Sequence, residues 1–336
     1  MSVAVLVLAA LVAGLLTGAI RRYSVHRRLV DEPNARSSHT VATPRGGGLA
    51  IVLVVLAGLL VLHARGALES ELLMALFGGG AVAVLGFVDD HGHVPARWRL
   101  LGHFIAALWA LVWLGGSPAV EFLEVSLHLG WLGHALALVY LVWMLNLYNF
   151  MDGIDGIAAL EAITVCVAAS FCYLLAGRAA GAAELLLAAA ACGFLVWNFP
   201  RAWIFMGDVG SGFIGITLGI LALHAAWQEP RLLWCWLILP AIFVTDATFT
   251  LLRRLQRGDA VHQAHRSHAY QIAVRRCGRH VPVTLAITAI NIGWLAPLAL
   301  AVASGWGDGF VTTLIAYLPL LGLAIGLGAG SPEQTN

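Results

Sequence analysis

Eleven long apolar runs follow one another along this chain, and they constrain its fold more than any other feature. A run of about 17–25 apolar residues is long enough to cross the hydrocarbon core of a membrane as a helix. Only 11% of the 336 residues are charged, whereas charged residues make up about a quarter of a typical soluble domain. The sequence therefore predicts an all-α, polytopic integral membrane protein with ten or eleven transmembrane helices in one domain, residues 1–336. The predicted spans are 2–20, 46–64, 70–88, 100–116, 132–148, 156–176, 180–199, 209–227, 232–252, 282–303 and 308–328.

The arginines predict the orientation of these spans. The chain has no lysine, and sixteen of its nineteen arginines lie after odd-numbered spans. Because positively charged loops stay in the cytoplasm, we expect the odd-numbered loops to be cytoplasmic and the N-terminus to lie outside. The arginines around the first span follow its apolar run, which is the charge order of a retained anchor rather than of a cleaved leader. A net charge of +1 gives no indication of nucleic-acid binding.

The unusual polar residues gather in five segments, all on odd-numbered loops. A chain that concentrates its polar chemistry on one membrane face is expected to build a site there. The predicted active-site segments are 31–48, 86–99, 146–156, 199–212 and 253–281.

Five aspartates stand at the ends of the predicted spans: Asp89, Asp90, Asp152, Asp155 and Asp208. An ionised carboxylate beside hydrocarbon costs a few kcal/mol, which makes each of them a functional candidate. Capping of a helix N-terminus is the alternative for any one of them. Carboxylates that converge in one cleft repel each other unless a cation joins them. Hard oxygen ligands favour Mg²⁺ or Mn²⁺, so we expect a divalent metal site.

The segment "NLYNFMDGIDG" (146–156) places polar side chains at every third residue, namely Asn146, Asn149, Asp152 and Asp155. This spacing keeps the four near one stripe of a helix as it runs into its loop. The two glycines of the segment allow a sharp turn and a close approach to a ligand. Amides and carboxylates together suit a nucleobase, ribose hydroxyls or a hydrated metal, and aspartate repels a bare phosphate. The segment therefore favours a metal-bridged nucleotide.

Basic residues on the same loops form the complementary half of the predicted site. Arginine and histidine suit a diphosphate or a lipid phosphate. Contact with anionic lipid is the alternative for each arginine, and zinc is the alternative for the histidines. The basic candidates are Arg36, His39, Arg45, Arg97, Arg99, Arg201, His262, His265, Arg266 and His268.

Four motifs in order, "VDD", "NxxNxxDGxDG", "FMGDVGS" and a histidine-rich loop, resemble the polyprenyl-phosphate N-acetylhexosamine-1-phosphate transferases. This family includes MraY and the WecA-type enzymes, and the resemblance spans roughly residues 30–270. "PNARSSH" and "HRSHAYQ" look most like the WbpL-like enzymes that start O-antigen.

The resemblance implies transfer of a sugar 1-phosphate from a UDP-N-acetylhexosamine to undecaprenyl phosphate with release of UMP. It implies a Mg²⁺-dependent enzyme of the bacterial inner membrane, with a cytoplasmic active site, that acts first in making a surface glycan; a homodimer is possible.

The resemblance also implies a role for each matching residue. Metal ligands are Asp208, Asp89 and Asp90; catalytic residues are Asp89, Asp90, Asp155, His265, Arg266 and His268; substrate-binding residues are Arg36, His39, Arg45, Arg97, Asn146, Asn149, Asp152, Phe205 and His262.

Two departures from the family pattern bear on these roles. His93 stands where MraY has a lysine, which moves the basic role to Arg97, and "HQAHRSH" differs from the short histidine motif of the WecA-type enzymes, which leaves the donor sugar open. We expect Asp89 to take a proton from the lipid phosphate, and a covalent aspartyl intermediate is the competing mechanism. A secondary transporter that uses Asp246, inside the ninth span, is the alternative function.

Overall fold

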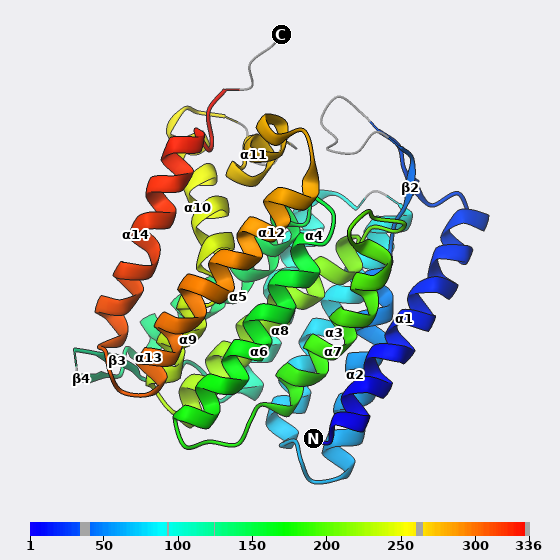
Figure 1. The fold of residues 1–336 in the computed structure, drawn as a ribbon. Coiled ribbons are helices and arrows are strands. Elements are labelled where there is room, and N and C mark those ends of the chain that lie inside the picture. The colour runs from blue at the N-terminus through cyan, green and yellow to red at the C-terminus, as the bar shows by residue number, and fades with distance from the viewer. Residues whose placement is uncertain (34–40, 93, 124, 260–264, 333–336) are drawn as a thin grey trace.

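The computed structural model is a bundle of long helices, which confirms the predicted all-α membrane fold (Figure 1). It describes residues 1–33, 41–92, 94–123, 125–259 and 265–332. The elements are α1 (Val3–His26), β1 (Val30–Asp31), β2 (Thr43–Pro44), α2 (Gly48–Ala64), α3 (Ser70–His91), α4 (Ala96–Trp113), β3 (Val120–Phe122), β4 (Val125–Leu127), α5 (Gly130–Met151), α6 (Ile157–Leu175), α7 (Ala182–Asn198), α8 (Asp208–Gln228), α9 (Arg231–Ile238), α10 (Ala241–Gln256), α11 (Ala269–Cys277), α12 (His280–Ile290), the π-helical turn η1 (Asn291–Leu295), α13 (Ala296–Ala303) and α14 (Gly309–Leu327).

Each of the eleven predicted spans corresponds to one helix or to a run of joined helices. By length and composition, seven described helices can cross a membrane, or eight if the bent pair α9 and α10 is one span. The count is lower than the prediction because α2 and α7 have only 17 residues each, and because the first turn of α4 carries Arg97 and Arg99. The ninth predicted span is bent by 68° between α9 and α10. Pro240 stands at this break and, lacking an N–H, cannot continue the hydrogen-bond ladder.

Helix ends follow from local chemistry. Asp308 starts α14 by accepting a hydrogen bond from the Val311 N–H at 2.9 Å, and Gly328, with φ of 81°, ends the same helix. The two described hairpins are antiparallel: β1 pairs with β2, and β3 pairs with β4. Helices leave no backbone group of a span without a partner in lipid, which explains why the spans are helical.

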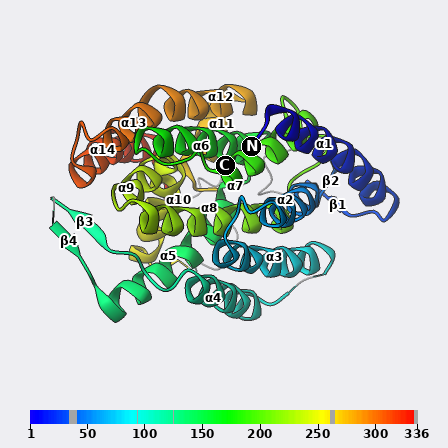
Figure 2. The same cartoon turned by 90° about the horizontal axis from the view of Figure 1, so that it is seen from below.

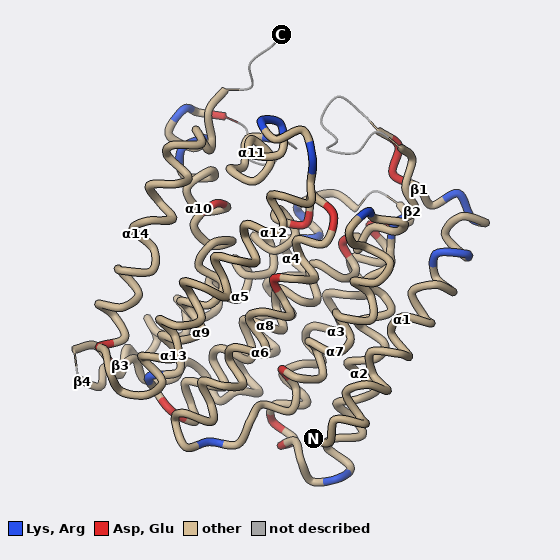
Figure 3. The backbone as a smooth tube through the Cα atoms, viewed as in Figure 1, with Lys and Arg blue, Asp and Glu red and all other residues tan. Residues whose placement is uncertain are grey.

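The loops that follow α1, α3, α5, α7 and α10 all lie at one end of the bundle, which we call the site end (Figures 1 and 3). Residue 1 lies at the opposite end, because α1 runs the length of the bundle before the first of these loops. The arrangement gathers the predicted active-site segments on one face. Which side of the membrane this face occupies stays a prediction.

Helix α8 lies at the centre of the bundle, between α6 and α7 on one side and α3 and α5 on the other (Figure 2). It is almost entirely buried. Glycines let its neighbours approach: a Cβ added at Gly215 would lie 2.6 Å from the Met144 carbonyl oxygen. Small residues serve this purpose in membrane helices, where close packing replaces the hydrophobic effect as the main source of stability. The first residue of this central helix is Asp208.

Candidate active site

The segments "PRGGG" and "FMGDVGS" meet where α8 begins. The Phe205 N–H donates to the Pro44 carbonyl at 2.8 Å, and the Gly48 N–H donates to the Met206 carbonyl at 2.9 Å. A Cβ added at Gly48 would lie 2.4 Å from the Cα of Gly210, so only glycine allows this approach. The glycine motif therefore packs the start of α2 against the start of α8.

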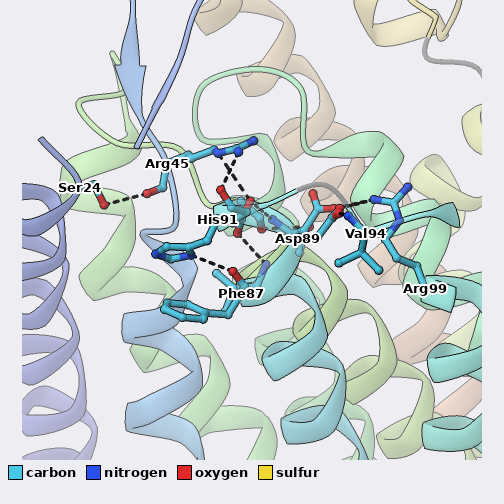
Figure 4. A network of polar contacts seen from close by, with 12 residues as sticks. Ser24, Arg45, Phe87, Asp89, His91, Val94 and Arg99 are labelled. Atoms are coloured by element: carbon cyan, nitrogen blue, oxygen red, sulfur yellow. Dashed lines mark hydrogen bonds and ion pairs between the residues drawn. The ribbon is translucent and has the colours of Figure 1, made fainter. Parts of the chain in front are cut away.

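Asp90 caps the N-terminus of α8 from α3. Its Oδ1 accepts from the Asp208 N–H at 3.3 Å and its Oδ2 accepts from the Val209 N–H at 3.2 Å. A carboxylate is stabilised there because the first N–H groups of a helix lack partners and carry partial positive charge. Arg45 donates to the Asp90 backbone carbonyl at 2.6 Å (Figure 4). Asp90, with only 5% of its side chain exposed, therefore fixes the position of Asp208.

Arg99 joins Asp89 to Asp208. Its Nη1 lies 2.5 Å from Asp89 Oδ2 and 3.2 Å from Asp208 Oδ2, and Figure 4 shows Asp89 and Arg99 pointing toward each other. The other Asp89 oxygen accepts from the Val94 N–H at 2.8 Å. Arg97 is exposed and its guanidinium lies over the ring of Trp98, 5.6 Å from the centroid. The structure thus places Arg99, rather than Arg97, between the carboxylates.

The donor set around Asp208 fits a magnesium ion that is completed by substrate. Among the described residues no three acidic, histidine or cysteine side chains converge to form a cage. Mg²⁺ is commonly held by one or two carboxylates together with phosphate oxygens and water. Asp89 and Asp208 supply two such carboxylates, Asn149 is a hydrogen-bond partner of Asp208, and the Arg99 guanidinium shows that a cation is stable between them.

A cavity of about 400 Å³, which we call the aspartate cavity, opens beside Asp208. Asp208 is 33% exposed, in contrast to the capping Asp90. One wall is apolar and comes from α3, α4 and α5. The polar lining residues are Arg99, His103, Asn146, Asn149, Asp208, His265, His268 and Gln271, and the apolar ones include Val82, Leu85, Leu100 and Leu145.

Asp246 holds the histidine segment on this cavity. From α10 it accepts the backbone N–H groups of Ala269 at 2.8 Å and Tyr270 at 3.0 Å, and the Nδ1 of His268 lies 3.3 Å from its Oδ1. It therefore caps α11 as Asp90 caps α8. Sequence reasoning missed this role because Asp246 and His268 are far apart in the chain.

His265 lines the aspartate cavity as an uncharged hydrogen-bonding group. Burial, and then the neighbouring His268 and Arg254, lower the pKa of His265 to about 3. Its Nδ1 lies 2.9 Å from the Ser267 hydroxyl. Arg266 is held through its carbonyl by Arg275 at 2.7 Å. Four residues named above, Arg36, His39, His93 and His262, lie outside the described residues.

Residues of α11 and α7 hold the two ends of the loop 152–156. The Tyr270 hydroxyl donates to the Phe150 carbonyl at 3.1 Å, and Asn198 Oδ1 accepts from the Gly156 N–H at 2.9 Å. A Cβ added at Gly153 would lie 2.0 Å from the Tyr270 oxygen, and Gly156 has φ of 76°. A side chain at residue 153 would therefore collide with Tyr270, and the left-handed backbone at residue 156 favours glycine. Asn146 donates to the Val142 carbonyl of its own helix at 2.7 Å.

A second cavity of about 890 Å³, which we call the arginine cavity, is lined in part by Asp155 of this loop. It contains Asp155 and Phe205 and is bordered by arginines of three segments. Some candidates of the sequence analysis line the aspartate cavity, others line the arginine cavity, and Asp89, Asp90 and Asp152 line neither. The residues that define the arginine cavity are Arg21, Asp155, Arg201, Phe205, Arg279 and His280.

Asp152 lies near both Asp208 and Asp90. Burial, and then repulsion by these two carboxylates, raises the pKa of Asp152 from 3.8 to about 7. A group whose pKa is raised by folding stabilises the folded state below its unfolded pKa, and this contribution is lost as pH rises through the folded value.

We expect the stability of the metal-free protein to fall between pH 4 and pH 7 and then to level off, by at most about 1.4 kcal/mol per pH unit. Asp152→Asn, which cannot ionise, removes this slope. Thermal unfolding in detergent with a chelator, followed by tryptophan fluorescence, measures the difference. Parallel pH profiles for the two proteins would contradict the raised pKa.

The chain is similar to one known protein family and to several known proteins. The model of "Glycosyl transferase family 4" matches residues 72–226. A "Probable undecaprenyl-phosphate N-acetylglucosaminyl 1-phosphate transferase" of Bacillus subtilis is 28% identical, covering 93% of this chain and 89% of that protein. A "Decaprenyl-phosphate N-acetylglucosaminephosphotransferase" of Mycolicibacterium smegmatis is 31% identical, covering 79% and 76%. A "Phospho-N-acetylmuramoyl-pentapeptide-transferase" of Moorella thermoacetica is 33% identical, covering 65% and 74%.

Proposed function

The chain belongs to glycosyl transferase family 4, and on that premise we propose that it transfers an N-acetylhexosamine 1-phosphate from a UDP-sugar to undecaprenyl phosphate and releases UMP. The observation that carries the proposal is the meeting of Asp89, Arg99 and Asp208, from three helices, at the start of α8 beside the aspartate cavity. The relatives are named for transfers of phosphosugars, in part to polyprenyl phosphates.

The reaction joins two anions, a lipid phosphate and a nucleotide diphosphate. Phosphoryl transfer of this kind depends on charge neutralisation and in-line positioning more than on covalent help. When bound, Mg²⁺ supplies the charge that neutralises the diphosphate, and Asp208 and Asp89 would hold it. Arg99 steadies phosphate oxygens in the aspartate cavity, where it already binds both carboxylates.

Asp89 is the group that we assign to proton transfer. A phosphate monoester loses its second proton near pH 6, so a neighbouring carboxylate can take that proton before attack. Asp90 is engaged by two backbone N–H groups and acts through Asp208. A covalent aspartyl intermediate is the competing mechanism, and exchange of labelled UMP into UDP-sugar without lipid would reveal it.

The two cavities suit the two substrates. The aspartate cavity has an apolar wall that fits the first isoprene units of the acceptor, beside the polar groups that fit its phosphate. The arginine cavity offers Phe205 for stacking on uracil and Asp155 for the hydrogen-bond donors of a nucleoside. Asn149 and Asp152 lie on the segment between them, where the diphosphate has to reach Asp208.

We place the enzyme in a bacterial inner membrane with the site end in the cytoplasm, where UDP-sugars are made. There it would catalyse the first membrane step of a surface glycan such as O-antigen, as a homodimer. The transporter alternative gains nothing from Asp246, because both carboxylate oxygens of that residue accept hydrogen bonds from the start of α11.

Purified protein given undecaprenyl phosphate, Mg²⁺ and one UDP-sugar at a time should release UMP with at least one of UDP-GlcNAc, UDP-FucNAc and UDP-QuiNAc. The control is the same mixture without lipid, which should release none if transfer is direct. A stoichiometric lipid-linked product, seen by mass spectrometry, identifies the donor. Absence of UMP with every donor, from folded protein, would overturn the proposed function.

A further inference from the structure

The first turn of α12 contacts Asp155 at the wall of the arginine cavity. His280 Nδ1 lies 3.1 Å from Asp155 Oδ2 and 3.4 Å from the Asp155 backbone nitrogen. Both side chains are 14% exposed, so the pair is largely shielded from water while it borders the cavity. A contact between imidazole and carboxylate in such surroundings fixes orientation more strongly than one on an open surface.

Thr284 adds a second contact on the same face of the helix. Its hydroxyl donates to the Asp155 carbonyl at 2.9 Å. Residues four apart on a helix lie one above the other, so His280 and Thr284 reach the same target. With Nδ1 protonated toward Oδ2, helix α12 thus holds the carboxylate and the carbonyl of Asp155.

Deeper in the bundle a separate contact seats α12 and η1 against α6. Asn291, the first residue of η1, donates to Glu161 Oε2 at 2.6 Å and to the Thr164 hydroxyl at 3.0 Å. This buried contact fixes the helix without touching residue 155. A substitution at Asn291 can therefore disturb the packing of α12 against α6 without removing the contact between His280 and Asp155.

Resting on the proposed function, we propose that His280 is a positioning residue of the donor site, which orients the Asp155 carboxylate toward a nucleoside diphosphate in the arginine cavity. With Oδ2 held by the imidazole, Oδ1 is the oxygen left to accept from the N–H and O–H donors of the uridine. The ring fixes the carboxylate in advance, and such preorganisation lowers the cost of binding. His280 lies beyond the segment in which the family motifs occur, and its contact with Asp155 is the one from which its role is argued.

Steady-state kinetics of three variants test this role. We expect His280→Ala to raise the KM for the UDP-sugar about tenfold, the factor expected from losing one hydrogen bond to a charged group. The kcat should stay within about twofold and the KM for undecaprenyl phosphate should not change. His280→Asn, whose amide can replace Nδ1 as donor, should recover most of the loss. In Asp155→Asn, the further change His280→Ala should have no additional effect.

Asn291→Ala is the structural control, because it loosens α12 without reaching Asp155. It should lower the melting temperature and leave the KM for the UDP-sugar unchanged; an equal rise in that KM would show that His280 acts only by seating the helix and would overturn the proposal. An unchanged KM in His280→Ala would overturn it as well. If His280→Ala does not fold, His280→Gln, which moves the amide one bond further, takes its place.

The activity of the wild type distinguishes a failure of the proposed function from a failure of the positioning role. If folded wild type releases no UMP with any donor, the proposed function has failed, and calorimetric titration with UMP decides the inference by itself. Weaker UMP binding by His280→Ala than by wild type supports the positioning role, and equal or absent binding by both contradicts it.

Discussion

Asp208→Asn should lower turnover about 10²–10³-fold while leaving the protein folded, the scale of effect seen when one preorganised charge-stabilising group is removed from an active site. The side chain of Asp208 faces the aspartate cavity and binds Arg99, whereas its backbone N–H is the group that Asp90 accepts. Asparagine keeps that N–H and the side-chain shape, and it loses the negative charge needed beside a divalent cation.

The measurement is the initial rate of UMP release at saturating substrates and Mg²⁺, together with the melting temperature. Glu71→Gln is the matched control, because Glu71 is an exposed acid at the far end of α3, the helix that carries Asp89. It should behave as wild type. Asp208→Asn with most of its Mg²⁺-dependent turnover intact would refute the assignment of Asp208 as a metal ligand.

Asp90→Ala and Asp89→Asn should both abolish most activity, for different reasons that the melting temperature separates. Alanine at 90 leaves the N–H groups of Asp208 and Val209 buried without their acceptor, and each such group costs about 1–3 kcal/mol. We therefore expect Asp90→Ala to lose about 2–6 kcal/mol of stability along with its activity. Asp89→Asn keeps an oxygen for the Val94 N–H and should retain the wild-type melting temperature.

Asp90→Asn is the informative intermediate. Its amide keeps one acceptor oxygen for the start of α8, so stability and turnover should both lie between those of wild type and Asp90→Ala. Asp90→Ala with an unchanged melting temperature would show that the cap is dispensable. Asp89→Asn as unstable as Asp90→Ala would contradict the division of labour between the two acids.

The lengths of the apolar runs were enough to predict the helices and to predict that the loops after alternate spans lie at the same end of the bundle. The sequence could not reveal the 68° bend between α9 and α10, because a proline within a span is compatible with either a kink or a break. The short spans α2 and α7 were recognised as apolar, and with 17 residues each they stand at the lower limit of what can cross a membrane.

The site was predictable as a set of residues and not as a geometry. Asp89 and Asp90 are neighbours in the chain, but successive helical residues are rotated by about 100°, so Asp89 contacts Arg99 while Asp90 contacts the start of α8. The same rotation separates exposed Arg97 from Arg99 two residues later. Asp246 and His280 meet their partners only after folding, and no spacing in the sequence indicates those contacts.

Binding of Mn²⁺, followed by electron paramagnetic resonance of the free ion, tests most directly whether acids from distant segments meet around one divalent cation. In the presence of UDP-sugar we predict one Mn²⁺ per chain in wild type and in Glu71→Gln, displaced by Mg²⁺, with binding lost in Asp208→Asn and weakened in Asp89→Asn. Equal Mn²⁺ binding by wild type and Asp208→Asn, or turnover that persists in excess chelator, would contradict the account.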